Sequence, residues 1–422
     1  MSGVTHRERS AILVGAGEDR QVRELGRLAE TLGLEVLGTL EQGRLDGVGY
    51  LGHGKREELK ELVEQKGAGV VVADDELSPS QARVLEKAAG VPVVDRTALI
   101  IRIFEAHARD AASRLEVELA ELTYRLPRVR GGYTALSRLG GGGVTTRGPG
   151  EQQLEYDRRV IRRRMETIRK RLQEEKAARE VRGARLRKEG PPSVALVGYT
   201  NAGKTTILNS LSGENRSTAD RLFETLETTT RLIKSAPAEN GRNGPVSRPD
   251  FVLTDTVGFI MKLPTQLVHS FASTLEAAED ADVIILCADA SSERLEEEIR
   301  TVEETLAETF AGNGTPGETI LCLNKADLVS GERRCGLASS YPGAVLVSAG
   351  QDASPLVEAI NEALKRSMVR VELFIPHAEY GAVSDLYGRA EIHAQKNTNE
   401  GLKLDVTLPE LQVHRYAHYR TA

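Results

Sequence analysis

The segment SVALVGYTNAGKTT has the residue types and the spacing of a phosphate-binding loop. It fits the pattern G-x-x-x-x-G-K-[ST] and lies between an apolar strand and a helix, the context that this pattern requires. The glycines let successive backbone N–H groups surround a β-phosphate, Lys204 adds positive charge toward the β- and γ-oxygens, and the Thr205 hydroxyl can bind Mg²⁺. We therefore expect the whole loop to hold the phosphates of a nucleotide, with Lys204 also catalytic: Gly198, Tyr199, Thr200, Asn201, Ala202, Gly203, Lys204 and Thr205.

A second motif, N-K-A-D, follows the apolar run TILCLN and indicates which base is bound. The Asp327 carboxylate offers two acceptors to the N1–H and 2-amino groups of guanine, whereas adenine has no donors there and would leave the carboxylate unpaired. Downstream of a phosphate loop and at the end of a strand, this motif predicts guanine. The next loop could brace the base through backbone N–H groups, so the candidate contacts are Asn324, Lys325, Asp327, Ser348 and Ala349.

A third motif, D-T-V-G, follows the strand DFVLT and comprises Asp255, Thr256, Val257 and Gly258. The Asp255 carboxylate can hold Mg²⁺ through water, and the Gly258 N–H can meet the γ-phosphate, which makes this glycine a catalytic candidate. Loss of the γ-phosphate would free the segment that follows, so the motif predicts a two-state switch.

Mg²⁺ bound to a nucleotide needs a second hydroxyl, and the segment F-E-T-L upstream offers one from Thr225. On residue type alone, three threonines that follow compete for the same role: Thr228, Thr229 and Thr230. The residue types therefore leave the choice open.

The charge distribution is uneven. Residues 158–188 contain 14 Lys/Arg and 4 Asp/Glu, a local charge of +10 in a chain of formal net charge −6, which leaves −16 on the remainder. A basic segment in an acidic protein favours a polyanionic partner for that segment alone. A solvated helix face with arginines paired at i±4 is an equally open interpretation.

The elements that position these motifs follow from hydrophobic periodicity. Apolar runs at residues 11–17, 34–40, 68–74 and 90–95 alternate with amphipathic stretches, which predicts a small α/β domain with a parallel sheet. The G-A-G segment after the first run could suggest a dinucleotide-binding turn, but the sequence has no third glycine and no convincing ribose-binding acid there. We therefore interpret it as a tight strand-to-helix turn.

Two leucine- and isoleucine-rich seams then predict two long helices in an antiparallel hairpin, the first ending at Pro127 and the second beginning near Glu151. The glycine-rich loop between them carries four arginines suited to a phosphate backbone, although a plain flexible tip stays open: Arg128, Arg130, Arg138 and Arg147. After the nucleotide-binding region, alternating segments from residue 369 onward predict a small β-rich domain.

Composition limits the remaining possibilities. The chain has 422 residues, enough for about three domains, with 40% hydrophobic and 28% charged residues. No apolar stretch is long enough for a membrane span, and MSGVTHRERS lacks a secretory pattern, so we expect a cytoplasmic protein. Three scattered cysteines exclude a disulfide framework, and 4% aromatic residues without tryptophan argue against a base-stacking platform. His53 and His107 are isolated, which favours structural roles.

The chain resembles the HflX-type ribosome-associated GTPases along nearly its whole length. The resemblance rests on GYLGHGKREEL, DELSPSQ, VPVVDRTALI, LEVELAELTYRLPR, LSRLGGGG and TRGPGEQQLEYDRR, together with GYTNAGKTT, LFETLETTTR, DTVGFI and NKAD. It implies an α/β fold: a P-loop, Ras-like G domain preceded by a small α/β domain and a long antiparallel helical hairpin, with a small β-rich C-terminal domain. The expected boundaries are 1–107, 108–190, 191–366 and 367–422.

The same resemblance implies Mg²⁺-dependent GTP hydrolysis and binding of the large ribosomal subunit. It places the hairpin and its loop against ribosomal RNA and links binding to ribosome splitting, recycling or rescue. By motif position it makes Thr205 and Thr225 the Mg²⁺ ligands, Thr225 also being catalytic. The segment on the γ-phosphate side would be Phe223, Glu224, Thr225, Leu226 and Glu227.

Two alternatives of other classes accompany this interpretation. A GTP-dependent RNA-remodelling, RNA-modification or ribosome-assembly factor would need a second catalytic centre, and no such residue cluster stands out in the sequence. A binding protein with an inactive G domain conflicts with the intact lysine, magnesium-site hydroxyls and guanine carboxylate. We expect a monomer, with possible association to ribosomes or a membrane surface.

The residue after D-T-V-G generates a first prediction. In Ras-like proteins it is a glutamine that orients the attacking water, whereas Phe259 cannot hydrogen-bond a nucleophile. We expect the isolated protein to hydrolyse GTP at ~10⁻⁴ to 10⁻³ s⁻¹, the unassisted Ras scale. A single-turnover assay measures this rate, and a value of about 1 s⁻¹ or more without a partner would contradict it.

Overall fold

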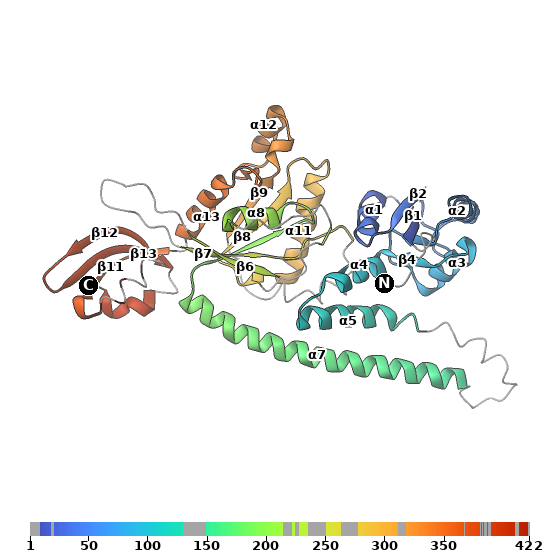
Figure 1. The fold of residues 1–422 in the computed structure, drawn as a ribbon, viewed down its shortest axis with the longest axis horizontal. Helices are drawn as coiled ribbons and strands as arrows, with labels where there is room; N and C mark the ends of the chain where they lie inside the picture. The colour runs from blue at the N-terminus through green and yellow to red at the C-terminus, as the bar shows by residue number, and fades with distance from the viewer. Residues whose placement is uncertain are drawn as a thin grey trace. The chain divides into compact units, whose positions relative to one another are not determined.

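The computed structural model describes residues 9–17, 21–129, 149–213, 222–223, 228–234, 250–262, 277–310, 318–366, 368–379, 381, 383, 386, 390–409 and 413–420. The chain forms two compact units (Figure 1). Unit 1 comprises Met1–Glu175, Arg221–Leu226 and Met261–Phe271, and unit 2 comprises Lys176–Asp220, Glu227–Ile260 and Ala272–Ala422.

Unit 1 begins with a four-stranded parallel sheet of order β2-β1-β3-β4, as the alternating pattern predicts. Its strands are β1 Ser10–Ala16, β2 Glu35–Gln42, β3 Val70–Ala73 and β4 Val93–Asp95, and its helices are α1 Val22–Thr31, α2 His53–Lys66 and α3 Pro79–Ala89. Local signals set the helix ends. A capping box between Ser78 and Gln81 starts α3, and left-handed Gly67 and Gly90 end α2 and α3.

The helical part of unit 1 contains α4 Arg96–His107, α5 Ala111–Arg125 and α7 Pro149–Glu189, the last continuing into unit 2. Helices α5 and α7 run antiparallel (Figure 1), which confirms the expected hairpin. Arg164 on α7 donates from Nε and Nη2 to the two carboxylate oxygens of Glu118 on α5, both at 2.6 Å. Met165 and Ile168 of the predicted seam are buried.

Arg128 is the one loop arginine among the four that the structure describes, and it has a structural role. Its guanidinium donates to the carboxylates of Asp95 and Glu76 at 3.1 and 3.2 Å and lies 3.5 Å from the centre of the Tyr124 ring. This side chain is therefore already engaged within unit 1. Arg130, Arg138 and Arg147 lie outside the described residues.

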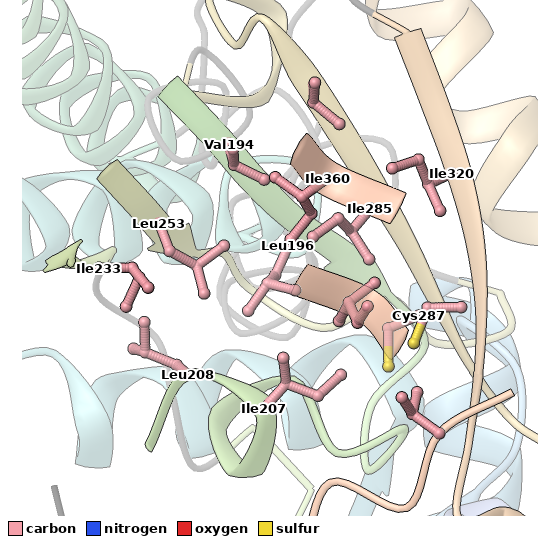
Figure 2. Packing of buried hydrophobic residues seen from close by; sticks show 14 of the residues in the cluster. Val194, Leu196, Ile207, Leu208, Ile233, Leu253, Ile285, Cys287, Ile320 and Ile360 are labelled. Carbon is pink, nitrogen blue, oxygen red and sulfur yellow. The ribbon is translucent and has the colours of Figure 1, made fainter. Parts of the chain in front are cut away.

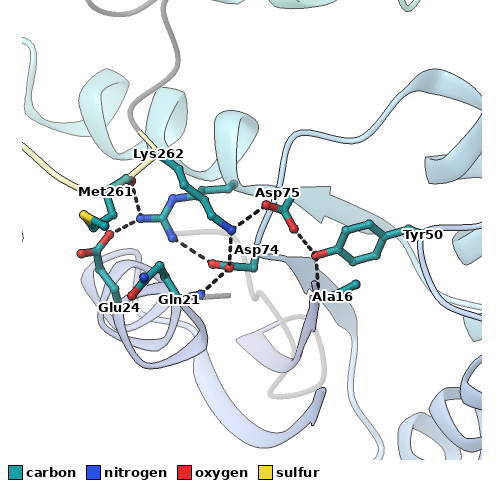
Figure 3. A network of polar contacts seen from close by, with 9 residues as sticks. Ala16, Gln21, Glu24, Tyr50, Asp74, Asp75, Met261 and Lys262 are labelled. Carbon is teal, nitrogen blue, oxygen red and sulfur yellow. Dashed lines mark hydrogen bonds and ion pairs between the residues drawn. The ribbon is translucent and has the colours of Figure 1, made fainter. Parts of the chain in front are cut away.

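A buried polar network lies at the carboxyl ends of β1, β3 and β4 (Figure 3). Asp74, which is 0% exposed, accepts from Arg96 Nη1 at 2.9 Å and pairs with Lys262 Nζ at 3.1 Å. Arg96 also pairs with Glu24 and donates to the Met261 carbonyl oxygen at 2.7 Å. These contacts hold residues 261–262 in unit 1.

The network continues through Asp75 and Tyr50. Lys262 Nζ lies 2.6 Å from Asp75 Oδ1, and the Tyr50 hydroxyl donates to Asp75 Oδ2 at 2.7 Å while accepting from the Ala16 backbone N–H at 3.2 Å. Burial raises the pKa of Tyr50, and the neighbouring carboxylate of Asp75 raises it further. The tyrosine hydroxyl therefore stays a donor.

Unit 2 is built on a six-stranded sheet of order β10-β9-β8-β5-β7-β6, in which only the β6–β7 pair is antiparallel. The strands are β5 Ser193–Gly198, β6 Thr229–Ile233, β7 Phe251–Asp255, β8 Val283–Asp289, β9 Glu318–Asn324 and β10 Val345–Leu346. The helices are α8 Lys204–Ser212, α11 Leu295–Phe310, α12 Gly331–Ser340 and α13 Ser354–Arg366, with the 3-10 turn η2 Ala326–Leu328. This is the expected P-loop G domain.

The core of this sheet explains its uninterrupted apolar strands. One face packs Val194, Leu196 and Ile285 against Ile207 of α8 and Ile360 of α13 (Figure 2). The intervening strand residues, which point to the opposite face, are buried as well: Ala195, Val197, Ile284 and Leu286. Strands covered on both faces need apolar residues at every position.

Two of the three cysteines belong to this core, as their apolar surroundings predict. Cys287 and Cys322 are register partners on β8 and β9, and both are buried. The hydrogen bond to Cys287, together with burial, raises the pKa of the Cys322 thiol. Cys335 is exposed.

The C-terminal residues form the expected small β-rich domain, an antiparallel sheet of order β11-β13-β12. Its elements are β11 Met368–Pro376, η3 His377–Glu379, β12 Glu391–Asn397, β13 Gly401–Pro409 and η4 His414–Tyr419. Alternate residues of the strands, such as Leu373, Leu404 and Val406, form its core with Tyr416. Within the part of the chain that the structure describes, no helix has the length and apolar character of a membrane span.

The network in unit 1 generates a stability prediction. In Arg96→Leu, the buried Asp74 carboxylate loses its ion pair with the Arg96 guanidinium and keeps only the pair with Lys262. Removal of one member of a buried ion pair lowers the free energy of unfolding by ~3–5 kcal/mol. We expect faster amide hydrogen exchange throughout β1 and β3. Arg164→Leu, which removes an exposed ion pair with Glu118, serves as the matched control and should change exchange far less. Equal exchange in both variants would contradict the assignment.

Candidate nucleotide-binding site

The phosphate loop joins the end of β5 to the start of α8, and β5 lies between β8 and β7 in the sheet, where the strand order changes direction. In open α/β sheets, ligands bind beyond the carboxyl ends of the strands at such a point. Helix α8 begins at Lys204 after Gly203, which has no side chain that could cap the first N–H groups. The first N–H groups of α8 are therefore oriented to receive an anion.

The two glycines of the motif are required by close backbone approach. A Cβ on Gly198 would lie 2.1 Å from the Cys287 carbonyl oxygen, and one on Gly203 would lie 2.2 Å from Asn324 Nδ2. Gly203 also has a φ of +91°, a backbone conformation that residues with a side chain rarely adopt. Any larger residue would displace the loop from β8 or from the last residue of β9.

Lys204 is buried within the loop that it serves. It is 6% exposed, and its Nζ donates to the carbonyl oxygens of Gly198 and Tyr199 at 3.0 and 2.9 Å. Burial lowers the pKa of Lys204, and the nearby Asp255 carboxylate opposes that shift. Phosphate oxygens beside the ammonium would favour its charged form in the same way.

The residues that would hold Mg²⁺ meet across two strands. Thr205 Oγ1 donates to Asp255 Oδ2 at 2.7 Å, and Asp255 is 0% exposed at the end of β7. A hydroxyl and a carboxylate oxygen side by side are the donor types that Mg²⁺ prefers. This pair therefore fits the metal. Thr225 lies outside the described residues, so its role stays a prediction.

The D-T-V-G loop packs directly on the phosphate loop. The Thr200 N–H donates to the Phe259 carbonyl oxygen at 2.7 Å, and the Phe259 N–H donates to the Gly198 carbonyl oxygen at 3.1 Å. Thr256 anchors the loop to β5, its Oγ1 donating to the Leu196 carbonyl oxygen at 2.6 Å, and Val257 is buried. The backbone of Gly258 thus lies beside the phosphate loop, as its expected γ-phosphate contact requires.

On the base side, the Asn324 side chain joins three loops. Its Nδ2 donates to the Ala202 carbonyl oxygen at 2.9 Å, and its Oδ1 accepts from the Ala349 N–H at 3.1 Å. The Ala326 N–H donates to the Val347 carbonyl oxygen at 3.0 Å. These bonds hold the N-K-x-D motif beside the loop that the sequence predicts to brace the base.

Asp327 itself is exposed within η2, where its carboxylate faces solvent and can meet a base. Lys325 adopts a φ of 59° and forms an ion pair with Asp289 at 2.7 Å. Ser348 is half-buried, and its carbonyl oxygen accepts from the Gln351 N–H at 2.7 Å. All these residues follow the carboxyl ends of β8, β9 and β10.

Not every predicted site residue lies at these strand ends. Phe223 belongs to unit 1, where its ring packs edge-on against Phe104 with centroids 4.6 Å apart. The remaining residues of that segment lie outside the described residues: Glu224, Thr225, Leu226 and Glu227.

Sequence reasoning missed the partners of several site residues. Asp289 is the last residue of the run VIILCAD, and an acid at a strand end was a usable signal. The binding of Lys262 by Asp74 and Asp75 had no comparable signal, because the three residues are distant in sequence. His107 is structural, with Nδ1 2.7 Å from the Ile103 carbonyl oxygen, and the described residues contain no cluster of metal-binding side chains.

Three family models match successive parts of the chain. Residues 19–105 match the model described as GTP-binding GTPase N-terminal, and residues 107–185 match its Middle Region. Residues 193–325 match the model of the 50S ribosome-binding GTPase, which spans the phosphate loop and the D-T-V-G motif and ends at the second residue of N-K-A-D.

Curated relatives match over most of their length. GTPase HflX of Caldanaerobacter subterraneus is 44% identical over 76% of this chain and 72% of its own. GTPase HflX of Alkalihalophilus pseudofirmus is 38% identical over 91% and 90%, and that of Escherichia coli is 36% identical over 92% and 89%. A solved GTP-binding protein from the archaeon Sulfolobus solfataricus is 21% identical over 85% of this chain and 98% of that chain, with a TM-score of 0.43.

The base-side geometry generates a specificity prediction. In Asp327→Asn, one acceptor becomes an amide donor, which suits the 2-carbonyl of xanthine and clashes with the 2-amino group of guanine. We expect GDP affinity to fall by about 100-fold or more and XDP affinity to rise. Competition binding measures both, with Glu332→Gln, the same change on the exposed first turn of α12, as the control. Unchanged preference for guanine would remove Asp327 from the site.

Proposed function

The chain belongs to the HflX family, with a ribosome-binding GTPase domain and GTP hydrolase activity, and from this premise we propose that its GTP form binds the large ribosomal subunit and couples hydrolysis to ribosome splitting, recycling or rescue. The observation that carries the proposal is the match of residues 193–325 to the 50S ribosome-binding GTPase model. Relatives named GTPase HflX that match more than nine tenths of the chain support it.

The nucleotide is held by the loops at the strand ends. The N–H groups of residues 198–205 and the start of α8 bind the phosphates, and Lys204 Nζ meets the β- and γ-oxygens. Thr205 and Asp255 would hold Mg²⁺, which when bound neutralises developing charge on the phosphates. Asp327 selects guanine, and Asn324 keeps its motif in register with the phosphate loop.

Hydrolysis needs one water placed in line with the γ-phosphorus. Water attacks that phosphorus, the bond to the β-phosphate oxygen breaks, and GDP and inorganic phosphate leave. The Gly258 N–H is oriented to the γ-phosphate, whereas the adjacent Phe259 offers no side-chain hydrogen bond to the water. The site therefore binds GTP but hydrolyses it slowly by itself, and a partner must supply the missing catalytic group.

Helix α7 supplies the surface for an RNA partner. Its exposed basic side chains between residues 158 and 176 include Arg162, Arg163, Arg169 and Lys170. Arg164 pairs with Glu118 of α5 and not with a carboxylate at i±4 on its own helix, while the net excess of positive charge favours a polyanion. We assign this face to ribosomal RNA.

A turnover assay tests the proposal. GTP hydrolysis is measured with and without purified large ribosomal subunits, for the unaltered protein and for Lys204→Ala. We expect subunits to accelerate hydrolysis by about 100-fold or more, since partner-supplied groups can give ~10³–10⁵-fold in related GTPases, and Lys204→Ala to abolish the acceleration. No acceleration by subunits would overturn ribosomal coupling and favour an RNA-remodelling role.

A charge-reversal pair locates the RNA contact. Arg162→Glu/Arg169→Glu should lose subunit binding and weaken its salt dependence, while intrinsic turnover stays unchanged. Lys396→Glu/Lys403→Glu makes the same charge change on the C-terminal sheet as a matched control. Equal binding by the two variants would contradict the α7 assignment. Sedimentation of intact ribosomes with the protein and GTP then distinguishes splitting from binding alone.

A further inference from the structure

The hydroxyl of Thr200 is a buried polar group that the fold does not use. Thr200 is 7% exposed, and its Oγ1 is fully buried and has no hydrogen-bond partner among the residues that the structure describes. Leaving a buried hydroxyl unsatisfied is unfavourable, so native structures rarely retain one without a reason.

Neighbouring threonines show what a structural role looks like in the same site. Thr256 Oγ1 donates to the Leu196 carbonyl oxygen at 2.6 Å, and Thr205 Oγ1 donates to Asp255 at 2.7 Å. Both hydroxyls are satisfied by the protein itself. Thr200, in the same loop region, is not, although its backbone N–H is bonded to the Phe259 carbonyl oxygen. A partner for Oγ1 from outside the chain explains the difference.

The position of Thr200 identifies that partner. A Cβ built on Gly258 would lie 2.7 Å from Thr200 Cγ2 and 3.0 Å from Lys204 Nζ. Thr200 therefore lies where the phosphate loop, the D-T-V-G loop and the catalytic ammonium meet. Lys204 and Gly258 are both assigned to the γ-phosphate side of the nucleotide, and Asp327 is assigned to the base.

The D-T-V-G loop also covers Thr200. The same Cβ on Gly258 would lie 2.9 Å from the Thr200 Cα, so the loop rests on the residue with no side chain between them. A γ-phosphate bound between Lys204 and Gly258 would separate the two loops and meet Oγ1 as they part. GDP, which ends at the β-phosphate, would not reach it.

We propose that Thr200 is a further catalytic residue of this GTPase, whose hydroxyl donates a hydrogen bond to an oxygen of the γ-phosphoryl group as its charge develops. The proposal rests on the placement of the nucleotide given under the proposed function. Thr200 forms no covalent bond and transfers no proton. With phenylalanine in place of a glutamine after D-T-V-G, this hydroxyl is a polar side chain that the chain itself supplies at the reacting phosphate.

Two near-isosteric variants test the hydroxyl. Thr200→Val keeps the branched shape and removes Oγ1, and Thr200→Ser keeps Oγ1 and removes the methyl group. Loss of one preorganised donor to a developing oxyanion lowers rates by ~10²–10³-fold in other enzymes, and we expect about a 100-fold loss of single-turnover hydrolysis in Thr200→Val. Thr200→Ser should stay within about threefold of the unaltered rate, since it keeps the donor.

Nucleotide affinities separate catalysis from folding. GDP affinity should be the same in both variants, because only the γ-phosphoryl group meets Oγ1. Full activity of Thr200→Val, equal loss in Thr200→Ser, or a matching loss of GDP affinity would each overturn the proposal. Lys204→Ala is measured alongside: if it stays active, the nucleotide placement itself is wrong, whereas an inactive Lys204→Ala with an active Thr200→Val overturns Thr200 alone.

Discussion

The buried side-chain amide of Asn324 is the interaction on which the nucleotide site depends. It donates to the phosphate loop at Ala202 and accepts from the loop at Ala349, so one residue at the end of β9 fixes the phosphate side and the base side together. The contact is so close that Gly203 must lack a side chain. Because both bonds are buried, an apolar replacement would leave a loop carbonyl and a loop N–H without partners at once.

The parallel sheet makes this possible. Strands β5, β7, β8 and β9 present their carboxyl ends at one edge, which gathers Gly198, Asp255, Asp289 and Asn324 although they are spread over much of unit 2. The apolar core on both faces of the sheet fixes strand order and register, and therefore the distances among these residues. A rigid core therefore holds the loop residues at fixed positions relative to one another.

The described residues of the site are positioned to bind the nucleotide, whereas a group that orients the attacking water is not among them. Lys204, Thr205 and Asp255 are already positioned within hydrogen-bonding distance of their partners, so little conformational freedom is lost when phosphate binds. The D-T-V-G loop, by contrast, is held through two backbone bonds to the phosphate loop, and Phe259 offers no side-chain hydrogen bond to a water. We expect a GTPase of this design to stay slow until a partner completes the site, and we propose that the basic face of α7 binds a polyanion.

The sequence by itself determined the motifs, the order of strands and helices, the hairpin and the choice of guanine, because each depends on a contiguous segment with its own periodicity, glycines or strand-end acids. It could not determine which distant residues meet. Thr205 hydrogen-bonds to Asp255, Asn324 to Ala202, and Lys262 to Asp74 and Asp75 in unit 1. The partners are so far apart in sequence that no local pattern encodes the pairs. Nor could it distinguish Thr200 from its satisfied neighbours. Only the tertiary structure decides such pairs, because hydrogen-bond partners are set by strand order and by the burial that excludes water.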